Sequence, residues 1–228
     1  MTISNSIKKD ILNDWSKEFQ GLSPYAQNKL YKVIGPFVTG VEIFKLPRAD
    51  DYRPYFVCYP LWKSNEKECL EESIILQEIK NKRGLQFNIP YIKHSVFYRE
   101  AVECAIKQIP ISFDRDVSLS NLFDAINNQF SYILIKSSPV QQAKLLEAKI
   151  FAALYINDMV SIKKVLEEVN KSFQNWRPDL FEWKFGKPGN WLQGLQKIVN
   201  NREGFLKQVK ANKQEKKIIK LKSSELTA

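Results

Sequence analysis

The chain has 228 residues, of which 44% are hydrophobic and 12% aromatic, and its formal net charge is +10. This length and composition exclude a disordered chain and supply enough apolar residues for a core. No run of about 18 apolar residues occurs and the N-terminus lacks the apolar stretch of a signal peptide, so we expect neither a membrane-spanning helix nor secretion.

The first predicted elements are two helices. Apolar residues recur at helical spacing over residues 5–20, which indicates an amphipathic helix. Residues 23–34 begin with Ser23-Pro24, a capping residue followed by a residue suited to the first helical position. They are followed by Gly35-Pro36, which is typical of a helix end. We therefore expect N-terminal helices before any strand.

From about residue 38 the apolar period changes from helical spacing to alternation, which predicts strands. An acidic link, residues 63–72, can form a short helix, and Gly84 can supply the positive φ of a turn. The short connections indicate an antiparallel sheet of about four strands. We place these strands at residues 38–46, 55–62, 73–80 and 85–92.

The remainder predicts mainly helices. Ser118 is a capping residue for one helix, Ser138-Pro139 starts another, and Asn157-Asp158 separates that helix from the next. Residues 132–136 are a candidate fifth strand, residues 175–191 are expected to be irregular, and the end from residue 221 is expected to be frayed. The predicted helices cover residues 97–105, 119–130, 138–156, 159–173 and 191–216.

Helices, then a sheet, then helices indicate the α+β class. We expect N-terminal helices and an antiparallel sheet of about four strands in residues 1–93, and a mainly helical part in residues 94–228. The alternative is one continuous domain over residues 1–216 with a frayed tail at 217–228.

A Glu-x-Lys motif ends the predicted strand at Glu78 and Lys80. Metal-dependent nucleases present such residues beside a further carboxylate, which Asp51 could supply, to hold Mg²⁺ near an attacking water. Four Glu-x-Lys triplets occur, however, at Glu78, Glu147, Glu182 and Glu215, and chance alone gives about two. The motif is therefore uninformative, and the triad Asp51, Glu78 and Lys80 remains only an alternative.

The cysteines and the single histidine are too few and too scattered for a structural zinc site, so we expect free, buried thiols, a cytoplasmic location, no metal and no cofactor. A serine or cysteine nucleophile would have to use His94, and neither Ser95 nor Cys104 is placed by the sequence to do so. We interpret His94 as a residue that makes a structural hydrogen bond. Neither of the usual glycine-rich phosphate loops occurs.

Residues 176–191 interleave aromatic rings with cations, an arrangement that can stack bases and follow a phosphate backbone. The alternative, which we favour, is that the rings pin this segment onto the helical core. The terminal lysines also form a candidate surface for phosphate or an acidic protein, or else a solvated helix face. The candidate binding residues are Trp176, Arg177, Trp183, Lys184, Lys187, Trp191, Lys207, Lys210, Lys213 and Lys217.

The lack of a nucleophile–base pair, a ligand cluster and a phosphate loop favours a protein that acts by binding. We expect a non-enzymatic protein-binding module of a bacterial cytoplasm, such as a toxin-neutralising immunity protein or an accessory protein of a defence system. The alternative is a basic nucleic-acid-binding protein, and a Mg²⁺-dependent nuclease ranks third. A protein partner is expected, nucleic acid is the alternative partner, a membrane is not expected, and the oligomeric state is left open.

Overall fold

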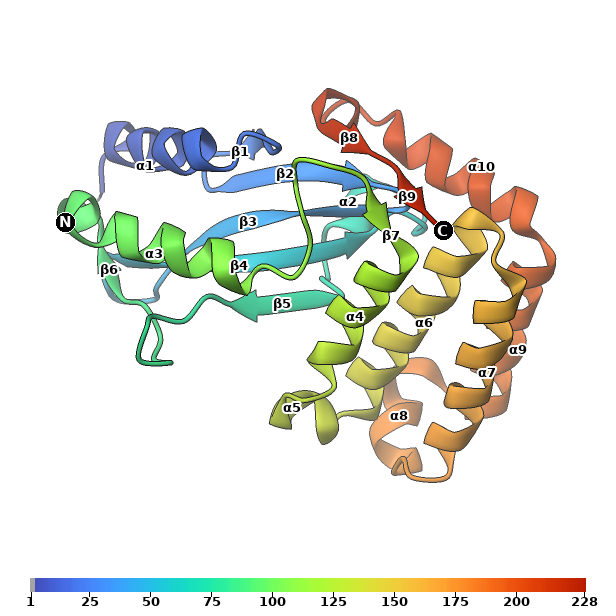
Figure 1. Cartoon of the computed structure of the whole chain (residues 1–228). Coiled ribbons are helices and arrows are strands. Elements are labelled where there is room, and N and C mark those ends of the chain that lie inside the picture. The colour runs from blue at the N-terminus through green and yellow to red at the C-terminus, as the bar shows by residue number, and fades with distance from the viewer. Residues whose placement is uncertain (1–2) are drawn as a thin grey trace.

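The computed structural model shows an antiparallel sheet with a group of helices packed against one end of it (Figure 1). The structure describes residues 3–228. One N-terminal helix is followed by five main strands in the order β1-β2-β3-β4-β5 and then by a mostly helical half. The predicted α+β class is confirmed, with a single helix before the sheet and one more main strand than expected.

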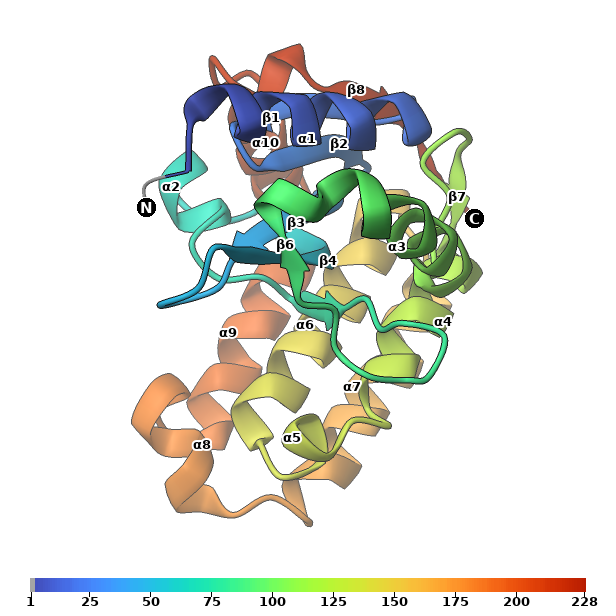
Figure 2. The same cartoon turned by 90° about the vertical axis from the view of Figure 1, so that its left-hand side faces the viewer.

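Helix α1 (Asn5–Glu18) and helix α3 (His94–Gln108) lie along the same face of the sheet (Figure 2). The Ser4 hydroxyl accepts a hydrogen bond from the Ile7 N–H, which satisfies one of the free donors at the start of α1. Helix α1 buries Ile11, Leu12 and Trp15. The short helix α2 (Glu66–Cys69) lies on the opposite side (Figure 2).

The predicted helix at residues 23–34 is wrong. Strand β1 (Ser23–Ala26) and strand β2 (Lys29–Ile34) form a hairpin there, and Gly35-Pro36 is the turn to β3 (Phe37–Lys45), since Ile34 pairs with Phe37. Gly35 has the positive φ that this turn requires. Glycine and proline therefore end a strand here. The backbone of β2 pairs with β3, and its β-branched and aromatic side chains are buried.

The centre of the sheet is the hairpin of β3 and β4 (Asp51–Pro60), paired from Phe37 with Pro60 to Lys45 with Tyr52. Strand β5 (Ile75–Glu78) pairs with β4 on its other side. The strand predicted at 85–92 pairs with β4 only over β6 (Ile89–Pro90). Of the alternating apolar residues, Phe87, Ile89 and Tyr91 are buried as predicted, whereas Leu85 is exposed. Pro90 lacks an N–H and residues 91–93 turn into the 3-10 helix η1 (Tyr91–Lys93), so the pairing stops.

The helical half is centred on α6 (Pro139–Ile156), which is buried around most of its circumference. The predicted caps are confirmed: Ser118 caps α4 (Leu119–Gln129) and Ser138 caps α6. Asn157-Asp158 separates α6 from α7 (Met159–Phe173) as expected, with Asn157 left-handed and Asp158 as the cap of α7. The remaining helices are α8 (Pro178–Phe185), α9 (Pro188–Asn200) and α10 (Arg202–Lys213).

Three expectations for this half are corrected. Residues 132–136 contain the helix α5 (Ile133–Lys136) and no strand, because no sheet edge lies beside them and the side chain of Gln142 binds their last carbonyls. The segment 175–191 is largely helical, since Pro178 and Pro188 occupy first helical positions. The helix expected at 191–216 is divided at Asn201, whose side chain caps α10.

The expectation of a frayed C-terminus is wrong. After the 3-10 helix η2 (Ile218–Lys220), strand β8 (Lys222–Ser224) pairs in parallel with residues 32–34 of β2. Strand β9 (Leu226–Thr227) pairs in parallel with β7 (Val117–Ser118). Strand β1 pairs only with residues 29–31 of β2, so the other half of that edge is open to β8. Within the described residues no helix has the length and apolar character needed to span a bilayer.

Candidate functional site

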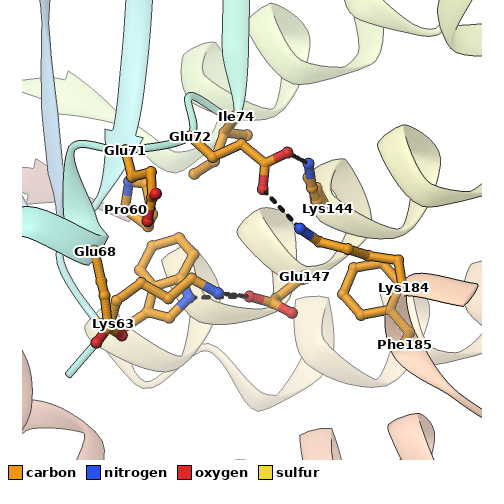
Figure 3. A pocket seen from close by; sticks show the side chains of 11 residues that line it. Pro60, Lys63, Glu68, Glu71, Glu72, Ile74, Lys144, Glu147, Lys184 and Phe185 are labelled. Carbon is orange, nitrogen blue, oxygen red and sulfur yellow. Dashed lines mark hydrogen bonds and ion pairs between the residues drawn. The ribbon is translucent and has the colours of Figure 1, made fainter.

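A cavity of about 570 Å³ opens where the end of the sheet meets the helical half (Figure 3). One wall is formed by the end of β4 and the segment that follows it, including α2, and the other wall is formed by α6 and α8. Charged residues dominate the lining: Lys63, Glu68, Glu71, Glu72, Lys144, Glu147 and Lys184. The apolar lining residues are Pro60, Trp62, Ile74 and Phe185.

Glu72 connects the two walls of this cavity. Its carboxylate accepts a hydrogen bond from the Lys144 ammonium of α6 and lies 3.6 Å from the Lys184 ammonium of α8 (Figure 3). Burial alone would raise the pKa of the Glu72 carboxyl, but the hydrogen bond and charge of Lys144, together with Lys184, bring that pKa below its usual value. Glu72 is therefore a fixed anion that holds the cavity walls together.

Glu147 on α6 makes a second connection. Its Oε1 accepts hydrogen bonds from the Trp62 indole N–H at 3.0 Å and from the Lys63 ammonium at 3.2 Å (Figure 3). Farther along, the side-chain amide of Asn212 on α10 donates to the Leu61 carbonyl at 2.9 Å and to the Lys63 carbonyl at 2.7 Å. The segment after β4 is thus held against the helices by charge-assisted and buried hydrogen bonds.

Glu68 and Glu71 form an acidic edge on the α2 side of the cavity, across from Lys184 and Phe185 in Figure 3. Glu68 accepts a hydrogen bond from the neutral side chain of Asn65 at 2.8 Å. Neither carboxylate is ion-paired with a lysine or arginine that the structure describes. This edge is therefore suited to a cationic group, although the chain as a whole is strongly basic.

Cys69, beside this edge, is not an activated nucleophile. Burial raises the pKa of its thiol to about 11, and its sulfur accepts a hydrogen bond from Asn212 at 3.4 Å. A protonated, buried thiol is a poor nucleophile. All three cysteines are free and buried, as the sequence predicts. The cavity is therefore equipped to bind a group and lacks a thiolate to attack one.

The nuclease alternative places Asp51, Glu78 and Lys80 together, and the structure does not bring them together. Glu78 pairs across the sheet with Tyr55, whereas Asp51 lies four residues away on β4, about 13 Å along the strand. The Glu78 carboxylate is bound by the Arg53 guanidinium at 3.1 Å. Among residues 3–228, no three histidine, cysteine, aspartate or glutamate side chains gather as a metal site would require.

The three candidate tryptophans have different environments. Trp176 is buried, stacks on Phe181 with ring centroids 5.3 Å apart, and donates its indole N–H to Gln142 at 2.8 Å. Trp191 packs edge-on against Phe181 at 5.5 Å. Trp183, by contrast, is 72% exposed on α8, directly before Lys184 and Phe185 of the cavity wall. Only Trp183 of the three stands free in solvent.

The candidate cations are also divided. Arg177 is ion-paired with Asp179 at 2.6 Å. Lys213 donates to the Tyr155 hydroxyl at 3.1 Å, and the Lys217 ammonium lies 5.5 Å from the centre of the Tyr25 ring. The exposed remainder is Lys187, Lys207 and Lys210. Three of the candidate cations are therefore engaged in separate local contacts, and only the exposed three remain for a partner.

His94 has a carboxylate partner that sequence reasoning missed. Its Nδ1 lies 2.7 Å from the Tyr52 hydroxyl and its Nε2 lies 3.2 Å from Oδ2 of Asp14 on α1. Burial lowers the pKa of His94, and Asp14 opposes this only in part. The trio ties α1, β4 and α3 together, and no serine or cysteine takes part in it. Asp14 is 80 residues away in the chain, so spacing could not reveal it.

A second missed feature is a buried carboxylate, Glu42, in the centre of β3. It accepts hydrogen bonds from the hydroxyl of Tyr31, from the hydroxyl of Tyr59 at 2.7 Å and from the Lys29 ammonium at 3.2 Å. The only signal for it is a charged residue at position 42 in an otherwise apolar run. Its partners come from the neighbouring strands: Lys29 is directly opposite Glu42 on β2, Tyr31 is two residues farther along β2, and the long side chain of Tyr59 reaches Glu42 from β4.

Comparison with models of known protein families, with curated proteins and with solved structures found no significant match to this chain.

Proposed function

We propose that this chain is a non-enzymatic protein-binding module that grips its partner at the cavity between α2, α6 and α8 and at Trp183 beside it. The observation that carries the proposal is the exposure of Trp183 on α8, the helix whose Lys184 and Phe185 line the cavity. Tryptophan is enriched among the few residues that dominate binding energy, especially beside a pocket. A large ring that is 72% exposed buries little of its surface on folding and loses contact with water when a partner covers it.

The ion pairs of the cavity support binding over chemistry. Lys144, Lys184 and Lys63 are ion-paired with Glu72 and Glu147, so these groups connect the walls of the cavity. A rigid cavity reduces the entropy lost on association. Within this proposal the setting is the cytoplasm of a bacterium, and the role is that of an immunity protein or a defence-system accessory protein.

The test compares capture of a partner by three immobilised proteins: the wild type, Trp183→Ala and the control Ile219→Ala. Ile219 is 56% exposed on η2, so it offers an apolar side chain away from the cavity. We expect the wild type and the control to retain the same protein, and Trp183→Ala to lose at least about 2 kcal/mol of binding free energy, roughly 30-fold in Kd. Thermal unfolding must show that all three are equally stable. Equal retention by Trp183→Ala would refute the proposal.

Nucleic acid is the second candidate, because Lys187, Lys207 and Lys210 are exposed and basic. Binding of a single-stranded oligonucleotide would weaken steeply with salt, with a slope of about −0.7 per neutralised phosphate on logarithmic axes. An interface centred on Trp183 responds far less to salt. Titration of a labelled oligonucleotide at several salt concentrations separates the two, and Lys207→Ala with Lys210→Ala identifies the cationic contribution.

A further inference from the structure

A second cavity, of about 380 Å³, adjoins the charged one, and Trp62 lines both. Its floor is aromatic: the ring of Phe151 lies 5.1 Å from that of Trp62 and 5.3 Å from that of Phe205. Its rim carries the polar side chains of Lys197 on α9, Gln208 on α10 and Asn201 between these two helices. Charged and aromatic cavities therefore stand side by side with one indole between them.

Helix α6 contributes side chains to both cavities. Lys144 and Glu147 line the charged cavity and Phe151 lines the aromatic one. Their spacings of three and four residues place them on one helix face, and seven residues of α-helix advance about 10 Å. The two cavities thus follow each other along one stripe of α6.

The charge of the first cavity decides what it accepts. Its lysines are already matched to Glu72 and Glu147, which leaves Glu68 and Glu71 without an ion-pair partner among residues 3–228. The ring of Phe185 lines the opposite side, and an aromatic face attracts a guanidinium or an ammonium group. The second cavity has an aromatic floor and suits an apolar side chain.

We infer that the paired cavities bind an extended segment of the partner protein, with an arginine or lysine side chain in the charged cavity and an apolar side chain two residues away in the aromatic cavity. Residues i and i+2 of an extended chain point to the same side and lie about 6.7 Å apart, and the long side chain of arginine or lysine spans the rest of the roughly 10 Å between Lys144 and Phe151 along α6. This inference rests on the proposed function, because it names the partner feature that the same site recognises.

The test uses short blocked peptides as probes, with binding measured by fluorescence anisotropy. One peptide carries Arg and Leu two residues apart, a second replaces Arg with Glu, and a third places Arg and Leu next to each other. We expect the first to bind at least about tenfold more tightly than the other two, since like charge and wrong spacing each disrupt one cavity.

Variants of the protein test whether Glu68 and Glu71 select the cationic peptide. The double variant Glu68→Gln with Glu71→Gln is expected to weaken binding of the first peptide about tenfold, and the exposed control Glu225→Gln to leave it unchanged. Equal affinity for the Arg and Glu peptides, no effect of the double variant, or no binding of any peptide would overturn the inference. The capture experiment with Trp183→Ala is independent of the peptides. If Trp183→Ala loses the partner but no peptide binds selectively, the proposed protein-binding function stands and the inferred preference for a cationic and an apolar side chain is wrong.

Discussion

Replacement of Glu42 with alanine is expected to lower the free energy of unfolding by about 3–5 kcal/mol, because removal of one partner of a buried charged network leaves the others unsatisfied. Glu42 is 2% exposed and accepts hydrogen bonds from Tyr31, Tyr59 and Lys29. Alanine cannot accept any of them.

The magnitude follows from the burial of each donor. The rings of Tyr31 and Tyr59 are buried, so each hydroxyl left without an acceptor costs about 1–3 kcal/mol. The Lys29 side chain is 28% exposed and can turn toward water, so its contribution is smaller. Glu42→Gln keeps one acceptor oxygen but removes the charge, so we expect a loss of about 1–3 kcal/mol.

The assay is urea denaturation followed by tryptophan fluorescence, since Trp15 is fully buried and reports the loss of the core. Glu71→Ala is the matched control, because this carboxylate is exposed and should change the free energy of unfolding by no more than about 0.5 kcal/mol. A loss below about 1 kcal/mol for Glu42→Ala, equal to that of Glu71→Ala, would show that the buried network contributes nothing to stability.

Three further outcomes are expected. In Gly40→Ala the new Cβ would lie 1.9 Å from a backbone carbonyl oxygen of β2, so the free energy of unfolding should fall by about 3 kcal/mol. In the control Gly194→Ala the new Cβ has open space in α9, so the free energy of unfolding should rise by about 0.5–1 kcal/mol. Equal effects of the two substitutions in urea denaturation would refute the close approach at Gly40. Because the pKa of His94 is lowered, the folded state binds a proton at His94 less readily than the unfolded chain does. The free energy of unfolding is therefore unaffected by this group above about pH 6.5, and it decreases as the pH falls from there through the folded pKa. NMR titration of this single histidine should give a value below 6.5, and His94→Gln should flatten the decline in stability between about pH 6.5 and 5; a titration at or above 6.5 would contradict the burial effect. Deletion of residues 222–228 removes β8, β9 and the buried Leu226, so the melting temperature should fall by roughly 6–12 °C, whereas a frayed tail would leave it unchanged.

Local chemistry allowed the helix starts to be predicted from sequence. Ser118, Ser138 and Asp158 each accept a hydrogen bond from an N–H three residues on, which is a contact within one turn. The hairpin at 23–34 could not be predicted in this way, because its serine, proline and glycine signals suit a helix or a strand turn equally. The outcome depends on pairing with β3, which is a tertiary contact.

The candidate site was less accessible to sequence reasoning. Lys144 and Glu72 are 72 residues apart, and Trp62 and Glu147 are 85 apart, so no spacing rule relates them. Glu147 appeared only as one of four Glu-x-Lys triplets. The interleaved aromatic segment did indicate a compact cluster around Phe181, but the exposure of a single tryptophan depends on which face of α8 meets α6 and α9.

The parallel pairing of Lys32 with Lys222 sets an order of events during synthesis. Strands β1 to β5 can assemble soon after their synthesis, whereas half of one edge of β2 must wait until residues 222–224 have been made. Contacts between such distant segments slow folding, and the nascent chain carries an unpaired strand edge meanwhile. Closure of this part of the sheet thus depends on residues 222–224, and a chain that has not yet docked them exposes half of one edge of β2.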